Sequence, residues 1–130
     1  MKIAICPGSY DPVTYGHLDI IKRSAVLVDK LIVTVFVNPS KKTSLFSIEE
    51  RLDMLRETTK DIPNVEVDTS TGLLNVYAAS KNCHLLIRGL RAFSDFEYEF
   101  QRALMIKKID PTLETAFFMT DGRYSYLSST

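Results

Sequence analysis

Short apolar runs alternate with amphipathic segments along the whole chain. Apolar runs rich in β-branched residues indicate buried strands, whereas apolar residues spaced three or four apart indicate helices. Strands are expected at residues 2–6, 31–37, 65–68, 83–87 and 114–119. Helices are expected from residue 16, after residue 47, over residues 73–81 and over residues 95–108. This alternation predicts an α/β fold, a doubly wound five-stranded parallel sheet with helices on both faces, in the flavodoxin-like or the Rossmann-like strand order.

Two of the predicted helices carry further signals. Ser47 and Glu50 have the spacing of a capping box, which predicts a helix start at residue 48. In the last helix, Asp95 is the expected cap. The helical spacing there predicts an inward face made of Phe96, Phe100, Ala103 and Leu104.

The two histidines fall at opposite edges of such a sheet. Doubly wound sheets bind ligands beyond the carboxyl ends of their strands. His17 follows the turn after the first strand and lies in the opening turn of a helix, where free amides and the helix dipole favour an anion. His84 stands at the start of the fourth strand. We therefore predict a phosphate-binding role for His17 and a structural role for His84.

Four basic residues follow predicted strands and are expected at the same edge as His17. Lys41 and Lys42 come after the second strand, and Arg88 and Arg91 come after the fourth. Cations from separate loops that gather at one edge predict a small polyanionic ligand, most simply a nucleotide together with a phosphate ester.

Composition narrows the class of protein. The 130 residues are 45% hydrophobic and 25% charged, which is typical of one globular domain and not of a disordered chain. The formal net charge is zero, so no nucleic-acid partner is expected. No apolar run approaches the roughly 20 residues of a membrane span, and no signal peptide is recognisable, so we expect a cytoplasmic protein without membrane contact.

The two cysteines, Cys6 and Cys83, match no zinc-binding spacing. They are expected at opposite ends of the first and fourth strands, at levels about 15 Å apart. A disulfide needs Cα atoms within roughly 7 Å. We therefore expect two buried free thiols.

The segment after the first strand lacks the two common phosphate-binding motifs. G-x-G-x-x-G does not follow the strand, and G-x-x-x-x-G-K-[ST] is absent, which disfavours a dehydrogenase and a P-loop kinase. Gly8 allows close approach of a ligand to the backbone, Ser9 offers a hydroxyl, and Gly16 clears space beside His17. No cysteine or activated serine stands at this edge as a nucleophile.

Residues Thr14-Tyr15-Gly16-His17 resemble the T-x-G-H signature of the nucleotidylyltransferase superfamily, and residues 127–130 resemble the start of its second signature, I-S-S-[ST]. Within the superfamily the chain resembles the phosphopantetheine adenylyltransferase family over essentially its whole length. The segments that carry this resemblance are PGSYDP from residue 7, PSKK from residue 39, FSIEER from residue 46, IRGLR from residue 87 and DFEYE from residue 95.

The resemblance implies transfer of the adenylyl group of ATP to 4′-phosphopantetheine, which gives dephospho-coenzyme A and pyrophosphate. The attack would be direct and in line, without a covalent enzyme intermediate, and catalysis would rest on positioning and charge stabilisation. Mg²⁺ would be carried by the ATP phosphates, so no metal-ligating residue is expected.

The resemblance also implies the site residues. The catalytic set would be His17, Ser9, Lys41 and Arg91. The 4′-phosphopantetheine site would use Ser9, Lys41, Leu74 and Arg88. The ATP site would comprise Ser9, Tyr10, His17, Gly89, Leu90, Arg91, Glu99, Tyr124, Ser125, Tyr126, Leu127, Ser128, Ser129 and Thr130.

Family resemblance further implies one nucleotidylyltransferase domain over residues 1–130, cut short at the start of its C-terminal helical segment. It also implies a homohexamer and feedback binding of coenzyme A. Phe36, Tyr98 and Leu104 are candidates either for subunit contacts or for the core. The alternatives are a sister enzyme that acts on nicotinamide mononucleotide or uses CTP, and a nucleotide- or coenzyme-A-binding module without turnover.

Overall fold

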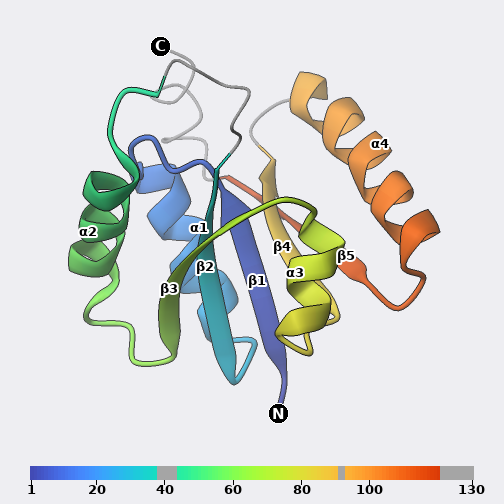
Figure 1. Cartoon of the computed structure of the whole chain (residues 1–130), viewed down its shortest axis with the longest axis horizontal. Coiled ribbons are helices and arrows are strands. Elements are labelled where there is room, and N and C mark those ends of the chain that lie inside the picture. The colour runs from blue at the N-terminus through green and yellow to red at the C-terminus, as the bar shows by residue number, and fades with distance from the viewer. Residues whose placement is uncertain (38–43, 91–92, 121–130) are drawn as a thin grey trace.

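The computed structural model describes residues 1–37, 44–90 and 93–120, and strands and helices alternate through them as predicted (Figure 1). The elements are β1 (Ile3–Gly8), α1 (Tyr15–Ala25), β2 (Lys30–Val37), α2 (Ile48–Thr59), β3 (Val65–Thr71), α3 (Leu74–Ser80), β4 (Leu85–Leu90), α4 (Phe93–Ile109) and β5 (Glu114–Met119). All strand pairings are parallel, in the order β3-β2-β1-β4-β5. The predicted doubly wound sheet is confirmed, and its order is the Rossmann-like one.

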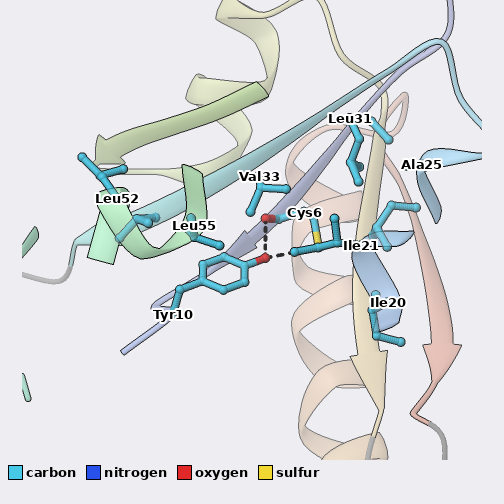
Figure 2. Close-up of a cluster of buried hydrophobic side chains, with 12 residues drawn as sticks. Cys6, Tyr10, Ile20, Ile21, Ala25, Leu31, Val33, Leu52 and Leu55 are labelled. Atoms are coloured by element: carbon cyan, nitrogen blue, oxygen red, sulfur yellow. Dashed lines mark hydrogen bonds between the residues drawn. The ribbon is translucent and has the colours of Figure 1, made fainter. Parts of the chain in front are cut away.

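Helices cover both faces of the sheet. On one face, Ala4 and Cys6 of β1 pack with side chains of α1 and α2 in a buried cluster (Figure 2). On the other face, Ile5 packs with residues of α3 such as Tyr77, and Ile106 of α4 packs against that second cluster. The chain leaves β1 toward β2 on one side, and β4 lies on the other, so the strand order reverses between β1 and β4. This reversal is where doubly wound folds bind their ligands.

Strand β4 differs from the prediction. It spans Leu85–Leu90 instead of residues 83–87, so Arg88 and Gly89 lie within the strand and not in a turn after it. The pairing with β5 continues to Leu90 and Met119. The sequence pattern missed this extension because a charged residue and a glycine interrupt the apolar run, whereas backbone hydrogen bonding to a neighbouring strand tolerates both.

The predicted inward face of α4 was right for Ala103 and wrong for the other three residues. Phe96, Phe100 and Leu104 are 47%, 44% and 50% exposed. The helix instead turns Glu99, Ala103 and Ile106 toward the sheet, at the helical spacing i, i+4, i+7. It begins at Phe93, so Asp95 lies inside the helix and not at its cap. Glu99 lies on the inner face, although a carboxylate usually faces solvent, because Arg88 of β4 pairs with it.

Strand β3 is also longer than predicted, Val65–Thr71 instead of residues 65–68. The expectations for the capping box and the thiols hold. Ser47 accepts a hydrogen bond from the Glu50 N–H, and Glu50 accepts one from the Ser47 N–H, which confirms the capping box at α2. Cys6 and Cys83 are buried free thiols, as expected. Within the described ranges, no helix is long and apolar enough to cross a membrane.

Candidate active site

The loop between β1 and α1, residues 9–14, is built around the side chain of Tyr10. The whole residue is 3% exposed, and the hydroxyl of its side chain donates to the Cys6 carbonyl oxygen at 2.8 Å (Figure 2). A Cβ added to Gly8 would lie 3.1 Å from Cε2 of the Tyr10 ring, so the absence of a side chain at Gly8 lets the ring fold back onto the strand. Tyr10 adopts a φ of 46°, which is uncommon for a residue with a side chain. The sequence predicted Tyr10 in the ATP site, and the structure buries this residue almost completely, with its side chain in the core cluster.

Two side chains tie this loop to the start of α2. The Asp11 carboxylate accepts hydrogen bonds from the backbone N–H groups of Leu45 and Phe46, at 2.7 and 2.8 Å. Nη1 of Arg51 in α2 donates to the Ser9 carbonyl oxygen at 3.1 Å. Ser9 itself is exposed, so its hydroxyl remains at the surface of the carboxyl edge.

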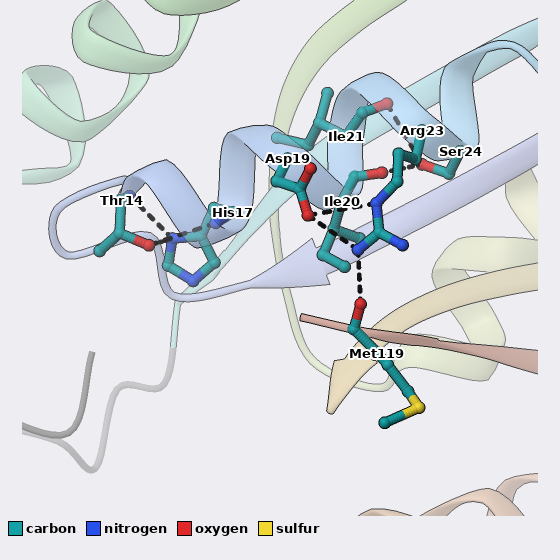
Figure 3. Close-up of polar contacts among 8 residues, drawn as sticks. All are labelled: Thr14, His17, Asp19, Ile20, Ile21, Arg23, Ser24 and Met119. Atoms are coloured by element: carbon teal, nitrogen blue, oxygen red, sulfur yellow. Dashed lines mark hydrogen bonds and ion pairs between the residues drawn. The ribbon is translucent and has the colours of Figure 1, made fainter. Parts of the chain in front are cut away.

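His17 forms part of the cap of α1. The Thr14 N–H donates to Nδ1 of His17 at 3.0 Å, while the Thr14 hydroxyl oxygen accepts from the His17 N–H at 3.2 Å (Figure 3). An Nδ1 that accepts from a backbone N–H carries no proton, so the neutral ring carries its proton on Nε2. The ring also meets Tyr10 edge to face, with centroids 4.9 Å apart. The contacts with Thr14 therefore hold His17, the predicted phosphate-binding residue, in one tautomer and one orientation.

Arg88 and Glu99 form a buried ion pair at the strand-order reversal. Nε and Nη2 of Arg88 donate to the two carboxylate oxygens of Glu99 at 3.1 and 2.8 Å, and Nη1 donates to the Pro7 carbonyl oxygen at 2.7 Å. The side chains are 24% and 8% exposed. Burial by itself lowers the pKa of Arg88, but the hydrogen bonds and charge of Glu99 outweigh it and hold that pKa above its ordinary value. The guanidinium therefore stays charged while it links β4, α4 and the end of β1.

A pocket opens beside this ion pair, between α3, α4 and the strands β4 and β5. Its lining residues are Leu74, Leu86, Arg88, Glu99, Arg102, Ala103, Ile106 and Thr115. Leu74 and Arg88, which the sequence assigned to one substrate site, therefore do meet in one pocket. Four of these eight residues are apolar, and the other four are the ion pair, Arg102 and Thr115, so the pocket offers both apolar surface and polar groups.

The remaining predicted site residues divide into two groups. Gly89 and Leu90 end β4 at the carboxyl edge, and a Cβ on Gly89 would lie 3.3 Å from Cγ1 of Ile20 in α1, so this glycine also serves helix packing. The other predicted residues lie outside the described residues: Lys41, Lys42, Arg91, Tyr124, Ser125, Tyr126, Leu127, Ser128, Ser129 and Thr130. In the part of the chain that the structure describes, no group of three or more His, Cys, Asp or Glu side chains is placed to hold a metal ion.

The sequence pattern did not reveal the structural roles of Arg51 and Asp11. A signal for Arg51 was present, because this charged residue falls on the apolar stripe that also carries Leu52 and Leu55. A charged residue on a buried stripe indicates a specific polar partner. Asp11 carried no comparable signal, since its partners are backbone groups more than thirty residues away.

Comparison with known proteins agrees with this geometry. A family model described as cytidylyltransferase-like matches residues 5–130, which places the chain in that class of nucleotidyltransferases. The phosphopantetheine adenylyltransferase of Caldanaerobacter subterraneus subsp. tengcongensis is 62% identical over 129 residues, 99% of this chain and 80% of that protein. The enzyme of the same name from Clostridium tetani is 57% identical over the same shares. The chain belongs to the phosphopantetheine adenylyltransferase family.

A solved structure extends the likeness of the fold. The lipopolysaccharide core biosynthesis protein of Thermoplasma volcanium GSS1 superimposes with a TM-score of 0.64, at 18% identity over 93% of this chain and 97% of that one. At this identity the likeness concerns the fold alone.

Proposed function

We propose that the protein transfers the adenylyl group of ATP to 4′-phosphopantetheine, producing dephospho-coenzyme A and pyrophosphate. The observation that carries this proposal is the 62% identity, over 99% of the chain, to a protein named for that activity. The meeting of Leu74 and Arg88 in one pocket supports it, because the resemblance in sequence had assigned both residues to the pantetheine side.

The reaction is a direct displacement. A phosphate oxygen of 4′-phosphopantetheine attacks the α-phosphorus of ATP, a new P–O bond forms, and the bond between the α-phosphorus and the bridging oxygen breaks, which releases pyrophosphate. His17 donates its Nε2 proton in a hydrogen bond to an α-phosphate oxygen, where negative charge is concentrated in the transition state. The proton stays on the ring, so His17 stabilises charge and is not consumed.

On the acceptor side, this pocket takes the pantetheine arm, with Leu74 against its aliphatic part. Arg88 presents a permanently charged guanidinium with N–H groups to spare, since Glu99 and Pro7 engage three of its five. Ser9 provides a hydroxyl for the attacking phosphate, and Lys41 belongs to the same proposed set.

On the nucleotide side, Gly89 and Leu90 are proposed to bind ATP together with Tyr10 and Glu99. Mg²⁺ is proposed to arrive with ATP as part of that substrate, held by phosphate oxygens. Arg91 and residues 124–130 complete the proposed ATP site.

Assembly, regulation and location are proposals of the same kind. A homohexamer needs apolar contact surface, and Tyr98 and Leu104 of α4 are 65% and 50% exposed, whereas Phe36 packs against a core cluster. We therefore assign Tyr98 and Leu104, and not Phe36, to candidate subunit contacts. Coenzyme A contains the pantetheine arm and is proposed to compete in the same pocket. The reaction is proposed to take place in the cytoplasm.

The test is pyrophosphate release by the purified chain with ATP, Mg²⁺ and 4′-phosphopantetheine. We expect turnover with this pair, and much less when nicotinamide mononucleotide replaces the acceptor or CTP replaces ATP. Preference for nicotinamide mononucleotide or CTP would assign the chain to a sister activity. Tight binding of ATP or coenzyme A without pyrophosphate release would identify a binding module.

A further inference from the structure

Arg51 is a charged side chain in an apolar setting. It is 6% exposed and lies on the same face of α2 as the buried residues Leu52 and Leu55. Among the described residues it forms no ion pair with a carboxylate, and its donors go to backbone carbonyl oxygens instead. Burying a charge is costly unless it is hydrogen-bonded, so the two carbonyl groups that receive these donors account for its position.

One of these carbonyl groups belongs to the loop that reaches the proposed site. Nε of Arg51 lies 3.4 Å from the Ser47 carbonyl oxygen of its own helix, while Nη1 donates to the Ser9 carbonyl oxygen at 3.1 Å, forty-two residues away in sequence. The second contact therefore sets the orientation of the peptide that joins Ser9 to Tyr10.

The orientation of that peptide determines where the Tyr10 N–H points. A trans peptide is planar, and its C=O and N–H groups point in opposite directions. The bond between Ser9 and Tyr10 is trans. Since Arg51 draws the Ser9 oxygen toward α2, the Tyr10 N–H points away from α2. Within the described ranges, this N–H has no hydrogen-bond acceptor.

The peptide is held on its other side as well. The Tyr10 hydroxyl donates to the Cys6 carbonyl oxygen, and the Tyr10 ring rests against Gly8. These contacts stabilise the φ of 46° at Tyr10, which the chain would not retain on its own. The N–H of Tyr10 is thereby fixed before any ligand binds, as preorganised donors in phosphoryl-transfer sites are.

We propose that Arg51 is a positioning residue for the adenylyl-transfer reaction: through the Ser9 carbonyl it aims the Tyr10 amide N–H at a phosphate group of the bound substrates. This inference rests on the proposed function, because the phosphates are those of the proposed reaction. Arg51 touches no substrate itself. Its effect is on the rate of the chemical step, since the misplacement of one donor by a fraction of an ångström matters most in the transition state.

The kinetic test uses Arg51→Met, which keeps the aliphatic stem and removes every donor. Replacement of a buried charged group by an apolar one of similar volume is often tolerated by a fold. We expect kcat to fall by about 10- to 100-fold, with the KM for 4′-phosphopantetheine little changed. Arg51→Lys keeps the positive charge and one donor nitrogen, and its kcat should fall between those of the Met variant and the parent. Arg56→Met, on the exposed side of the same helix, is the matched control and should keep the parent kcat. A folded Arg51→Met with kcat within about twofold of the parent, or equal losses in the Met and Lys variants, overturns the proposal.

A second measurement needs no variant that might fail to fold. In ¹⁵N-labelled parent protein, addition of ATP with Mg²⁺ should shift the Tyr10 amide resonance markedly, because the N–H gains an anionic acceptor. An unmoved Tyr10 resonance at saturating ATP overturns the proposal. The experiments distinguish the two proposals. Absence of pyrophosphate release in the parent refutes the proposed function, whereas normal release with an unmoved Tyr10 amide resonance refutes only the role of Arg51.

Discussion

Each edge of the sheet carries one histidine whose side chain contacts a threonine hydroxyl, but the surroundings of the two histidines differ. His17 and His84 are both exposed, and each places Nδ1 near a threonine hydroxyl, at 3.1 Å from Thr14 and 3.2 Å from Thr112. At the carboxyl edge, His17 stands at a helix start beside a loop that other elements hold in place. At the opposite edge, His84 faces a surface turn near Asp110. The comparison teaches that a hydrogen-bonded histidine becomes a candidate catalytic group through its position in the fold and not through its nearest partner.

Buried charge separates the edges in the same way. The carboxyl edge buries Arg51 and the pair of Arg88 and Glu99. At the opposite edge, the ion pair between Lys107 and Glu114 stays in solvent, with side chains 46% and 65% exposed. Burying charge is costly. Among the described residues, the carboxyl edge therefore bears a burial cost that the exposed pair at the opposite edge does not.

The largest expected difference between the two edges is in kcat, when each histidine is replaced. His17→Ala is expected to lower kcat by about 10²–10³, the loss typical of one transition-state donor. His84→Ala, the matched control, should keep kcat within about twofold because this side chain lies at the far edge of the sheet. Both are measured by pyrophosphate release at saturating ATP and 4′-phosphopantetheine. Near-normal turnover by the His17 variant would refute the role given to this residue.

The next effect is on stability and compares the two ion pairs. Arg88→Ala leaves Glu99 buried without its partner, and we expect the free energy of unfolding to fall by about 3 kcal/mol. Lys107→Ala breaks a solvent-exposed pair and should cost less than about 1 kcal/mol. Urea unfolding followed by circular dichroism measures both. Equal losses in the two variants would show that burial at the carboxyl edge carries no special cost.

The smallest effect concerns pH and one carboxylate near each edge. Hydrogen bonds from the backbone and hydroxyl of Ser47 hold the pKa of Glu50 below its ordinary value, and those from the hydroxyl and backbone of Thr112 do the same for Asp110. A carboxylate whose pKa is lower in the folded state adds stability above its unfolded pKa, and that stability disappears as the pH falls through the folded pKa.

Glu50→Gln and Asp110→Asn should therefore be slightly less stable than the parent at pH 7, and the differences should vanish well below roughly pH 4, where both unfolded carboxyls are protonated. Urea titrations at a series of pH values measure this. A deficit that persists unchanged at pH 2 would mean that geometry, and not charge, is responsible. Turnover at pH 7 should be unaffected in Asp110→Asn, which lies at the edge away from the site.

Much of the fold and part of the site followed from local patterns. The alternation of strands and helices, the capping box at Ser47 and the edge that carries His17 are all encoded by residues near one another in sequence, and the structure confirms each. Leu74 and Arg88 were assigned to one substrate site by the resemblance of their segments to a family, and the pocket brings them together. Their role in binding stays a prediction.

Local patterns along the chain were enough to predict the class of fold and the edge at which chemistry is expected, because periodicity and capping depend on neighbours within a few residues. Only the tertiary structure decided the Rossmann-like strand order, the length of β4, the inward face of α4 around Glu99, and the anchors Arg51 and Asp11. Each of these depends on a partner far away in the chain. From sequence alone, a charged side chain is expected to be exposed to solvent unless its distant partner is known. Its burial becomes favourable only when the folded chain supplies the hydrogen bonds that water would otherwise provide.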